Sequence, residues 1–369
     1  MKRYLFDQIN NDLARKMVFL GGPRQVGKTT LAKMVANNPV GYLNWDVAEH
    51  REVILRRELP TEPVLIFDEI HKYRSWRNYL KGLYDNKNLK SKILVTGSAR
   101  LDLYRYGGDS LQGRYHYLRL HPLSVAELKI NKKEGFDSLL HLGGFPEPFL
   151  SSSHVQAKRW SREYRTRLIR EDIASVEKVQ DLGNLELLMI RLPELVGNPL
   201  SINALREDLQ VSHKAISNWV SILERMYAIF RLSPLSSSKI RAVKKEQKHY
   251  HFDWTLVPSM PLRYENLVAA HLLKWVHFEQ DTKGRELDLC YFRDIDGREV
   301  DFVVTEDRKP IIAIECKWAD DSLSVPLKYL KNKFPSIDAW QLHAAGKKDF
   351  STPEGVRVAP ALTFLKDLI

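Results

Sequence analysis

Cysteines and long apolar runs are both scarce in this sequence. The chain has 369 residues and two cysteines, Cys290 and Cys316, each in a stretch that also contains apolar residues. Two such thiols form neither a disulfide framework nor a zinc pattern, so we expect buried thiols in a reducing cytoplasm. No apolar run is long enough to span a bilayer, so we expect no membrane partner. Residues 1–8 carry an acid and no long apolar core, which is not typical of a signal peptide.

Acidic residues are also in deficit. Lys and Arg number 57 against 46 Asp and Glu, which gives a net charge of +11. An excess of this size favours a polyanionic partner, nucleic acid first, although ordinary solubility charge would account for the composition equally well. The apolar content of 44% is normal for a globular protein, and the length suffices for two or three domains.

A glycine loop between an apolar strand (residues 17–20) and a helical stretch (residues 30–36) is the most informative feature. Its residues, which follow the pattern G-x-x-x-x-G-K-T and run on into Thr30, are Gly22, Pro23, Arg24, Gln25, Val26, Gly27, Lys28 and Thr29. The two glycines let backbone N–H groups turn toward phosphate oxygens, and the helix adds its positive end. Lys28 would reach the β- and γ-phosphates, and the Thr29 hydroxyl would ligate Mg²⁺. The pattern predicts an ATP site.

Two acids end the next buried strand, residues 64–67. In open α/β sheets ligands bind at the carboxyl ends of the strands, which is where Asp68 and Glu69 would lie. Asp68 would complete the Mg²⁺ shell, and Glu69 would polarise the attacking water as the catalytic base.

A third strand, residues 92–98, could lie between the other two. It would place Thr96 or Ser98 against the γ-phosphate as a sensor, and turn chemistry at a strand end is the alternative. Further on, Arg114 is either a surface arginine or an arginine finger. A finger acting in trans would require a homo-oligomer, which the sequence leaves open.

These motifs resemble a family of prokaryotic AAA-type ATPases in which a second, DUF-type region follows the ATPase module. The stretches that carry the resemblance are residues 22–30, 67–71, 96–100 and 113–115 in the first part, and 143–147, 264–268, 299–302 and 315–317 in the second. The resemblance extends over nearly the whole chain. It is specific for architecture and says little about biological role.

The middle of the chain is predicted to be helical with a winged helix. A basic helix spans residues 160–179, and Ser201 and Ser212 would cap two helices joined by a short turn. The start of the second helix would present base-contacting side chains: His213, Lys214, Ser217 and Asn218. A strand at 228–232 would lead into a basic wing that binds phosphates, with Lys239, Arg241, Lys244, Lys245 and Lys248. A winged helix used for packing or protein contacts is the alternative.

The last part shows the order helix, three strands, helix, strand. Asp301 lies on the second strand, Glu315 and Lys317 share one face of the third, and Glu265 opens the first helix. This resembles the PD-(D/E)xK nuclease core. The resemblance implies that Asp301, Glu315 and Glu265 hold Mg²⁺ or Mn²⁺ while Lys317 activates water or steadies the phosphate. Val300 replaces the proline of the family name, and whether the site cleaves DNA stays open.

We therefore predict an α/β protein in three parts. Residues 1–145 form a P-loop AAA-type ATPase domain, 146–254 a helical and winged-helix domain, and 255–369 a restriction-endonuclease-like α/β domain. The predicted function is a cytoplasmic ATPase coupled to a DNA-binding and DNA-cleaving module. Two alternatives remain: an ATP-dependent DNA-binding switch with an inactive nuclease fold, and a STAND-like signalling ATPase that binds protein partners.

Overall fold

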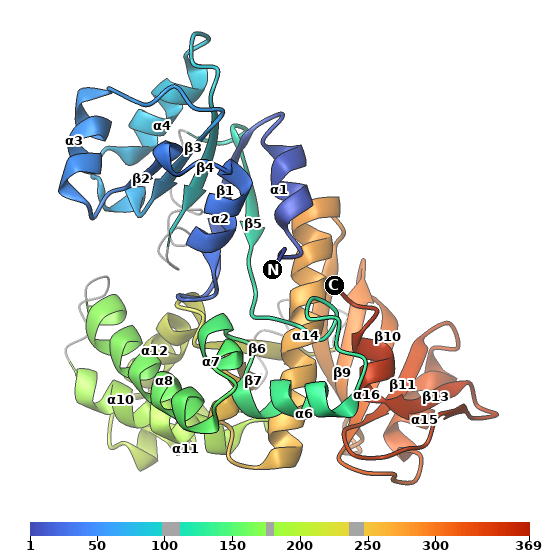
Figure 1. The fold of residues 1–369 in the computed structure, drawn as a ribbon. Helices are drawn as coiled ribbons and strands as arrows, with labels where there is room; N and C mark the ends of the chain where they lie inside the picture. The colour runs from blue at the N-terminus through green and yellow to red at the C-terminus, as the bar shows by residue number, and fades with distance from the viewer. Residues whose placement is uncertain (98–110, 175–180, 236–246) are drawn as a thin grey trace. The chain divides into compact units, whose positions relative to one another are not determined.

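The computed structural model describes residues 1–97, 111–174, 181–235 and 247–369. The chain divides into two compact units, the N-terminal unit (residues 1–122) and the C-terminal unit (residues 123–369), which Figure 1 shows in ribbon form. The three-part division with boundaries at 145 and 254 stays a prediction. No helix among the described residues is long and apolar enough to cross a membrane.

The N-terminal unit is built on a parallel sheet of five described strands in the order β2-β3-β4-β1-β5. The strands are β1 (Met17–Gly21), β2 (Tyr42–Asn44), β3 (Val64–Asp68), β4 (Lys92–Thr96) and β5 (Tyr115–Arg119). The helices are α1 (Phe6–Asp12), α2 (Lys28–Ala36), α3 (Ala48–Arg56) and α4 (Trp76–Asp85), with short 3-10 turns η1 (Pro39–Gly41) and η2 (Ile70–Lys72). The prediction that the third strand lies between the other two is confirmed, because β4 pairs with both β1 and β3.

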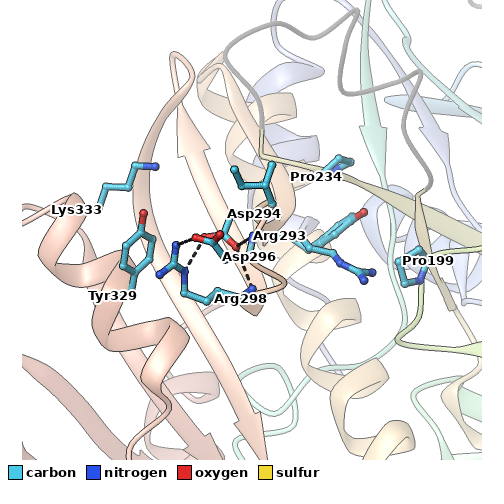
Figure 2. Close-up of a pocket in the computed structure, with 10 residues that line it drawn as sticks. Pro199, Pro234, Arg293, Asp294, Asp296, Arg298, Tyr329 and Lys333 are labelled. Carbon is cyan, nitrogen blue, oxygen red and sulfur yellow. Dashed lines mark hydrogen bonds and ion pairs between the residues drawn. The ribbon is translucent and has the colours of Figure 1, made fainter.

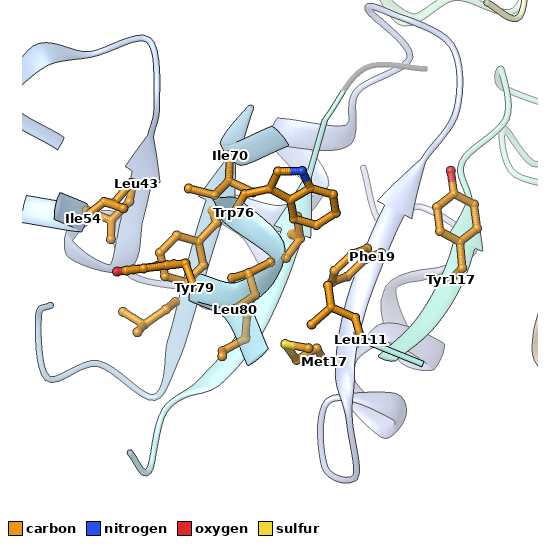
Figure 3. Close-up of a cluster of buried hydrophobic side chains, with 14 residues drawn as sticks. Met17, Phe19, Leu43, Ile54, Ile70, Trp76, Tyr79, Leu80, Leu111 and Tyr117 are labelled. Carbon is orange, nitrogen blue, oxygen red and sulfur yellow. The ribbon is translucent and has the colours of Figure 1, made fainter. Parts of the chain in front are cut away.

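Apolar strands explain why this sheet is parallel and covered by helices. Every residue of β1 is buried, as expected of a strand in a sheet with both faces covered. On one face, α4 supplies Trp76, Tyr79 and Leu80 to a cluster that also contains Phe19 (Figure 3). The ring centroids of Phe19 and Trp76 lie 6.1 Å apart. This packing anchors β1, the strand that precedes the glycine loop.

The C-terminal unit contains a second sheet, mixed in direction, of eight described strands in the order β12-β13-β11-β10-β9-β8-β6-β7. The strands are β6 (Ile229–Pro234), β7 (Lys248–His251), β8 (Leu287–Arg293), β9 (Glu299–Glu306), β10 (Lys309–Lys317), β11 (Asp338–His343), β12 (Phe350–Ser351) and β13 (Val356–Pro360). The α-helices are α6 (Lys133–Leu142), α7 (Pro146–Leu150), α8 (His154–Arg167), α10 (Leu182–Arg191), α11 (Ile202–Asp208), α12 (His213–Arg225), α14 (Met260–Lys283), α15 (Val325–Lys333) and α16 (Ala361–Leu365). The remaining turns are η3 (Leu168–Ile173), η4 (Leu192–Leu195) and η5 (Trp254–Leu256).

The predicted order of elements in the last part is confirmed as α14, β8, β9, β10, α15 and β11. The two capped helices are confirmed as well. Ser201 accepts the backbone N–H of Ala204 at the start of α11, and Ser212 accepts that of Ala215 at the start of α12. These local signals were readable because a cap and its partner lie three residues apart.

The predicted basic wing differs from the structure at its last residue. Strand β6 pairs in parallel with β8, so that β6 and β7 extend the sheet of the C-terminal elements. Lys248, the first residue of β7, is buried. The prediction that Lys248 is exposed to bind phosphates is therefore wrong. The other four wing residues lie outside the described part of the chain.

Candidate functional site

The glycine loop joins β1 to α2 in the N-terminal unit, as the motif requires. Gly22 and Gly27 have φ angles of 125° and 97°, which favour glycine. A Cβ on Gly22 would lie 2.2 Å from the carbonyl oxygen of Leu120, so the neighbouring chain also excludes a side chain there. Gln25 has a φ of 61°, a left-handed conformation that turns the loop. The loop backbone is thus held in a tight turn at the N-terminal end of α2.

Lys28 lies inside this loop. Its side chain is buried, and its Nζ donates to the carbonyl oxygens of Gly22 at 2.9 Å and Pro23 at 2.5 Å. An ammonium at the centre of the turned backbone is suited to meet phosphate oxygens. The other predicted cofactor-binding residues differ in exposure: Pro23 and Val26 are buried, Arg24, Gln25 and Thr29 are half-buried, and Thr30 is exposed.

Asp68 is held by three hydroxyl groups. Its Oδ2 accepts from Thr29 Oγ1 at 3.0 Å and from the Tyr42 hydroxyl at 2.7 Å, and its Oδ1 accepts from Thr96 Oγ1 at 2.7 Å. Burial and the adjacent Asp68 carboxylate raise the pKa of Tyr42, so this phenol stays a donor. Adjacent hydroxyl and carboxylate oxygens are the hard ligands that Mg²⁺ prefers, so Thr29 and Asp68 fit the predicted metal.

The sequence did not indicate Tyr42, and it placed Thr96 differently. Tyr42 opens the short strand β2, which pairs with β3 and was not predicted. The Thr96 hydroxyl is directed at Asp68 and not at an open space. The sensor role of Thr96 therefore stays a proposal, and Ser98, the other candidate, lies outside the described residues.

Glu69 follows Asp68 in a left-handed conformation, with a φ of 55°. Its backbone N–H donates to the Thr96 carbonyl at 3.0 Å, which holds this turn, and its carboxylate lies 3.4 Å from Lys72 Nζ. Burial raises the pKa of Glu69 although Lys72 opposes the shift. A carboxylate with a raised pKa, beside a metal-ligand pair, is suited to accept a proton from water.

Arg114 does not belong to this group of residues. Strand β5 runs parallel to β1 with Tyr115 beside Met17, so Arg114 lies at the opposite end of β1 from the glycine loop. The five residues of β1 separate the two ends by about 16 Å. The Arg114 guanidinium instead binds both carboxylate oxygens of Asp85, at 2.9 and 3.1 Å. An arginine finger in cis is therefore wrong for this residue, and a role in trans stays a prediction.

The C-terminal unit brings the predicted nuclease-like residues together. The backbone N–H of Cys316 donates to Asp301 Oδ2 at 2.8 Å, which joins β9 to β10. Lys317 Nζ lies 2.9 Å from Glu315 Oε1. On α14, Glu265 Oε1 accepts the hydroxyl of Tyr250 at 2.8 Å. We call these carboxylates, Glu265, Asp301 and Glu315, the acidic cluster.

The acidic cluster is poorly solvated. Burial, together with the charge of Asp301, raises the pKa of Glu265 to about 8 and that of Glu315 to about 7. Burial also raises the pKa of Asp301 itself, against the opposing effect of Lys248. Carboxylates in this state favour either protons or a cation close by.

The structure places a cation, the Lys248 ammonium, beside the acidic cluster, and the sequence did not indicate this position. Lys248 Nζ lies 2.5 Å from Glu299 Oε1, 4.0 Å from Asp301 Oδ1 and 5.3 Å from the centroid of the Tyr291 ring. Burial lowers the pKa of Lys248, but the charges of Asp301, Glu265 and Glu299 outweigh it, so the net shift is upward. The buried ammonium therefore stays charged beside the acidic cluster.

Lys248 lies beside Asp301, one of the predicted metal ligands. Within the ranges that the structure describes, no group of three or more His, Cys, Asp or Glu side chains is arranged to hold a metal ion. The metal set of Glu265, Asp301 and Glu315 therefore stays a prediction. Each carboxylate has a donor or cation beside it: Tyr250, Lys248 with the Cys316 N–H, and Lys317. The Oε2 of Glu315 is buried without a hydrogen-bond partner among the described residues.

A cavity of about 680 Å³ opens near the acidic cluster, between the β8–β9 turn and α15. In Figure 2 the Arg298 guanidinium lies over the Tyr329 ring, 3.9 Å from its centroid, and binds Asp294 at 2.7 Å. Arg293, which also lines the cavity, lies 3.8 Å from Glu299, the partner of Lys248. The cavity has the volume of a small-molecule site, and its cations are partly neutralised by its own acids.

Three family models match successive parts of the chain. Residues 14–129 match the model of an AAA domain. Residues 133–266 match a domain of unknown function, DUF8612, and residues 263–364 match another, DUF4143. The AAA match and the geometry of the glycine loop support an AAA-type ATPase, for which ATP and Mg²⁺ are the implied cofactors. The DUF4143 match fits the predicted second region, but nothing in it shows a nuclease.

Known relatives are distant. The chain is 23% identical over 327 residues to "Uncharacterized protein Rv2008c" of Mycobacterium tuberculosis. This match covers 80% of the chain and 72% of the relative. The chain is 23% identical over 307 residues to "Uncharacterized protein MJ1637" of Methanocaldococcus jannaschii, covering 67% and 63%. Among solved structures, the Hsp104–ADP complex of S. cerevisiae is similar with a TM-score of 0.30 and 18% identity, over 60% of this chain and 38% of that one. The chain thus spans less than two thirds of MJ1637 and of Hsp104.

Proposed function

We propose that this chain hydrolyses ATP in its N-terminal unit and binds DNA through its C-terminal unit. The observation that carries the first half is the joint placement of Thr29, Asp68 and Glu69 beside the glycine loop. The AAA match supports the same half. The second half rests on the net charge of +11 and on exposed side chains at the start of α12.

Different residues of the N-terminal unit bind the phosphates, hold Mg²⁺ and accept the proton in this proposal. The loop backbone and Lys28 bind and orient the phosphates, and Thr29 and Asp68 hold Mg²⁺, which supplies Lewis-acid polarisation of the phosphoryl group when bound. Tyr42 and Thr96 keep Asp68 in one orientation through their hydroxyls. Glu69 accepts the proton of the attacking water at its carboxylate.

DNA binding is proposed for the surface at the start of α12. His213, Lys214 and Asn218 are exposed there, and Ser217 is half-buried. The N-terminal residues of the second helix contact base edges in helix-turn-helix proteins. A charge reversal at Lys214 should weaken duplex binding, whereas a STAND-like signalling ATPase with protein partners would show little DNA affinity.

For the nuclease-like region we propose the non-cleaving role over cleavage. The buried Lys248 ammonium beside Asp301 supports this choice, because it supplies a fixed cation where the predicted mechanism needs a divalent metal. ATP turnover in the N-terminal unit would then control DNA binding without strand scission. Cleavage stays the second candidate because Asp301, Glu315 and Lys317 do lie together.

One experiment separates these candidates. The full chain is incubated with Mg²⁺ or Mn²⁺, with and without ATP, on single-stranded, duplex and branched DNA, and binding and scission are both recorded. We expect ATP-dependent changes in DNA affinity and no scission. Scission that Asp301→Asn abolishes would establish the nuclease. Turnover without affinity for any DNA would favour the protein-binding alternative.

A further inference from the structure

A cavity of about 550 Å³ in the C-terminal unit has basic side chains at six of its ten lining residues. It lies between α8, the end of α6 and the start of α14 and is separate from the acidic cluster. Its basic lining residues, which we call the basic pocket, are His141, His154, Lys158, Arg162, Arg165 and Arg263. This volume is in the range of sites for small ligands.

The spacing on α8 gathers three of these cations on one side of the helix. Lys158, Arg162 and Arg165 follow one another at intervals of four and three residues, so their side chains share one face. Over seven residues of helix they span about 10 Å. Like charges at such intervals oppose each other, so the helix carries an electrostatic cost along this face.

No salt bridge among the described residues offsets that cost. None of Lys158, Arg162, Arg165 and Arg263 forms a salt bridge with a described carboxylate, and the Nε of Arg165 is buried without a hydrogen-bond partner among the described residues. On the same helix, Glu163 is engaged by Arg167, at 2.7 Å.

A carboxylate next to the pocket, that of Asp253, is already engaged. Asp253 is buried beneath the pocket, where its Oδ2 accepts from Ser161 at 2.6 Å and its Oδ1 from the Thr255 hydroxyl at 2.6 Å. Arg263 donates its Nε to the Val257 carbonyl at 2.8 Å. Burial lowers the pKa of Arg263 despite the charge of Asp253, which indicates that its charge is incompletely compensated.

We propose that the basic pocket binds an anion that carries two or more phosphates. Guanidinium groups match phosphate oxygens in a two-pronged geometry, and a row of cations about 10 Å long can meet successive phosphates. The shared chemistry is an oligophosphate, supplied either free or as the backbone of a nucleic acid. The inference does not rest on ATP hydrolysis or on DNA contact by α12.

The test uses the full chain in a Lys28→Ala background, so that the glycine loop does not contribute phosphate binding. Two probes are used: inorganic triphosphate by calorimetry, and a labelled single-stranded oligonucleotide by fluorescence anisotropy. The pocket variant is Lys158→Gln with Arg162→Gln, both at exposed side chains. The matched control is Arg159→Gln with Lys347→Gln, which removes the same charge outside the pocket.

We expect the pocket variant to weaken triphosphate binding by at least about tenfold and the control to change it little. A parallel loss for the oligonucleotide, with a salt dependence reduced by about two phosphate contacts, would identify a nucleic-acid backbone as a source. A loss confined to triphosphate would identify a free oligophosphate. Equal affinities of pocket variant and control for both probes, with unchanged melting temperatures, would overturn the proposal. ATP turnover measured with Lys28 intact reports separately on the proposed function.

Discussion

The two sites surround a strand carboxylate, Asp68 on β3 and Asp301 on β9, with different kinds of donor. In the N-terminal unit Asp68 is held by three neutral hydroxyls, those of Thr29, Tyr42 and Thr96. In the C-terminal unit Asp301 is held by a backbone N–H and lies 4.0 Å from the ammonium of a buried lysine, Lys248. The hydroxyl donors of the first carboxylate are neutral, whereas the second has a cation built into the fold.

This difference shows how a group of acidic side chains can be assessed as a metal site. Carboxylate placement alone would score both sites as metal centres. What distinguishes them is the kind of donor around each acid, because hydroxyls leave the negative charge available and ammonium groups cancel it. The following predictions test this distinction, from the largest expected effect to the smallest.

Glu69→Gln should reduce ATP turnover by about 10²- to 10⁴-fold while ATP binding persists, because the amide fits the same space but cannot accept a proton. Steady-state turnover and nucleotide binding by calorimetry would check this. Glu49→Gln, at an exposed position on α3, is the control and should match wild type. Equal turnover in Glu69→Gln and wild type would remove Glu69 as the base.

Lys248→Met should destabilise the C-terminal unit by about 3 kcal/mol, because it leaves the half-buried carboxylates of Glu299 and Asp301 without the Lys248 ammonium. Denaturant unfolding of the full chain would measure the loss. Mn²⁺ should then raise the melting temperature of this variant more than that of wild type, and Asp301→Asn in the variant should remove the gain. An equal Mn²⁺ effect on wild type would show that Lys248 does not occupy the role of a metal.

His271 provides a pH test of buried ionisable groups in the C-terminal unit. Its ring accepts the backbone N–H of Val125 at 3.0 Å, and burial lowers its pKa from 6.5 to about 3. Between pH 3 and pH 6.5, the unfolded chain therefore binds a proton at His271 that the folded chain does not bind. The stability that depends on neutral His271 is present above pH 6.5 and is lost as the pH falls toward 3, by about 1.4 kcal/mol per pH unit. Unfolding of His271→Gln at several pH values should show a shallower acid dependence than wild type, and parallel curves would contradict the assignment.

Tyr42→Phe should have the smallest effect. It removes one of three hydroxyl donors to Asp68 while the ring stays, at a cost of about 1 kcal/mol. We expect a several-fold rise in the Mg²⁺ concentration needed for half-maximal turnover, with little change in fold stability. A variant indistinguishable from wild type in Mg²⁺ titrations would show that two hydroxyls suffice to orient Asp68.

Features that depend on neighbours in sequence were predictable. The glycine loop, the caps Ser201 and Ser212 and the run of elements from α14 to β11 all follow from patterns within a few residues. Tyr42 could not be assigned, because its partner Asp68 is 26 residues away and is reached only through the pairing of β2 with β3. Lys248 was misplaced for a similar reason, since a lysine in a basic segment gives no local sign that its strand is buried. Arg114 required the register of β5 against β1 to show which end of the sheet it occupies.

The pairing of β6 with β8 has a practical consequence for how the nuclease-like region can be studied. An excised fragment of residues 255–369 would lose β6 and β7 together, and Lys248 with them. Cys290 and Tyr291 of strand β8 would then lose their pairing with β6, which exposes this part of the strand edge to association with other chains. Such a fragment would aggregate or rearrange, and its behaviour toward metal ions would report on acids that have lost their native counter-charge.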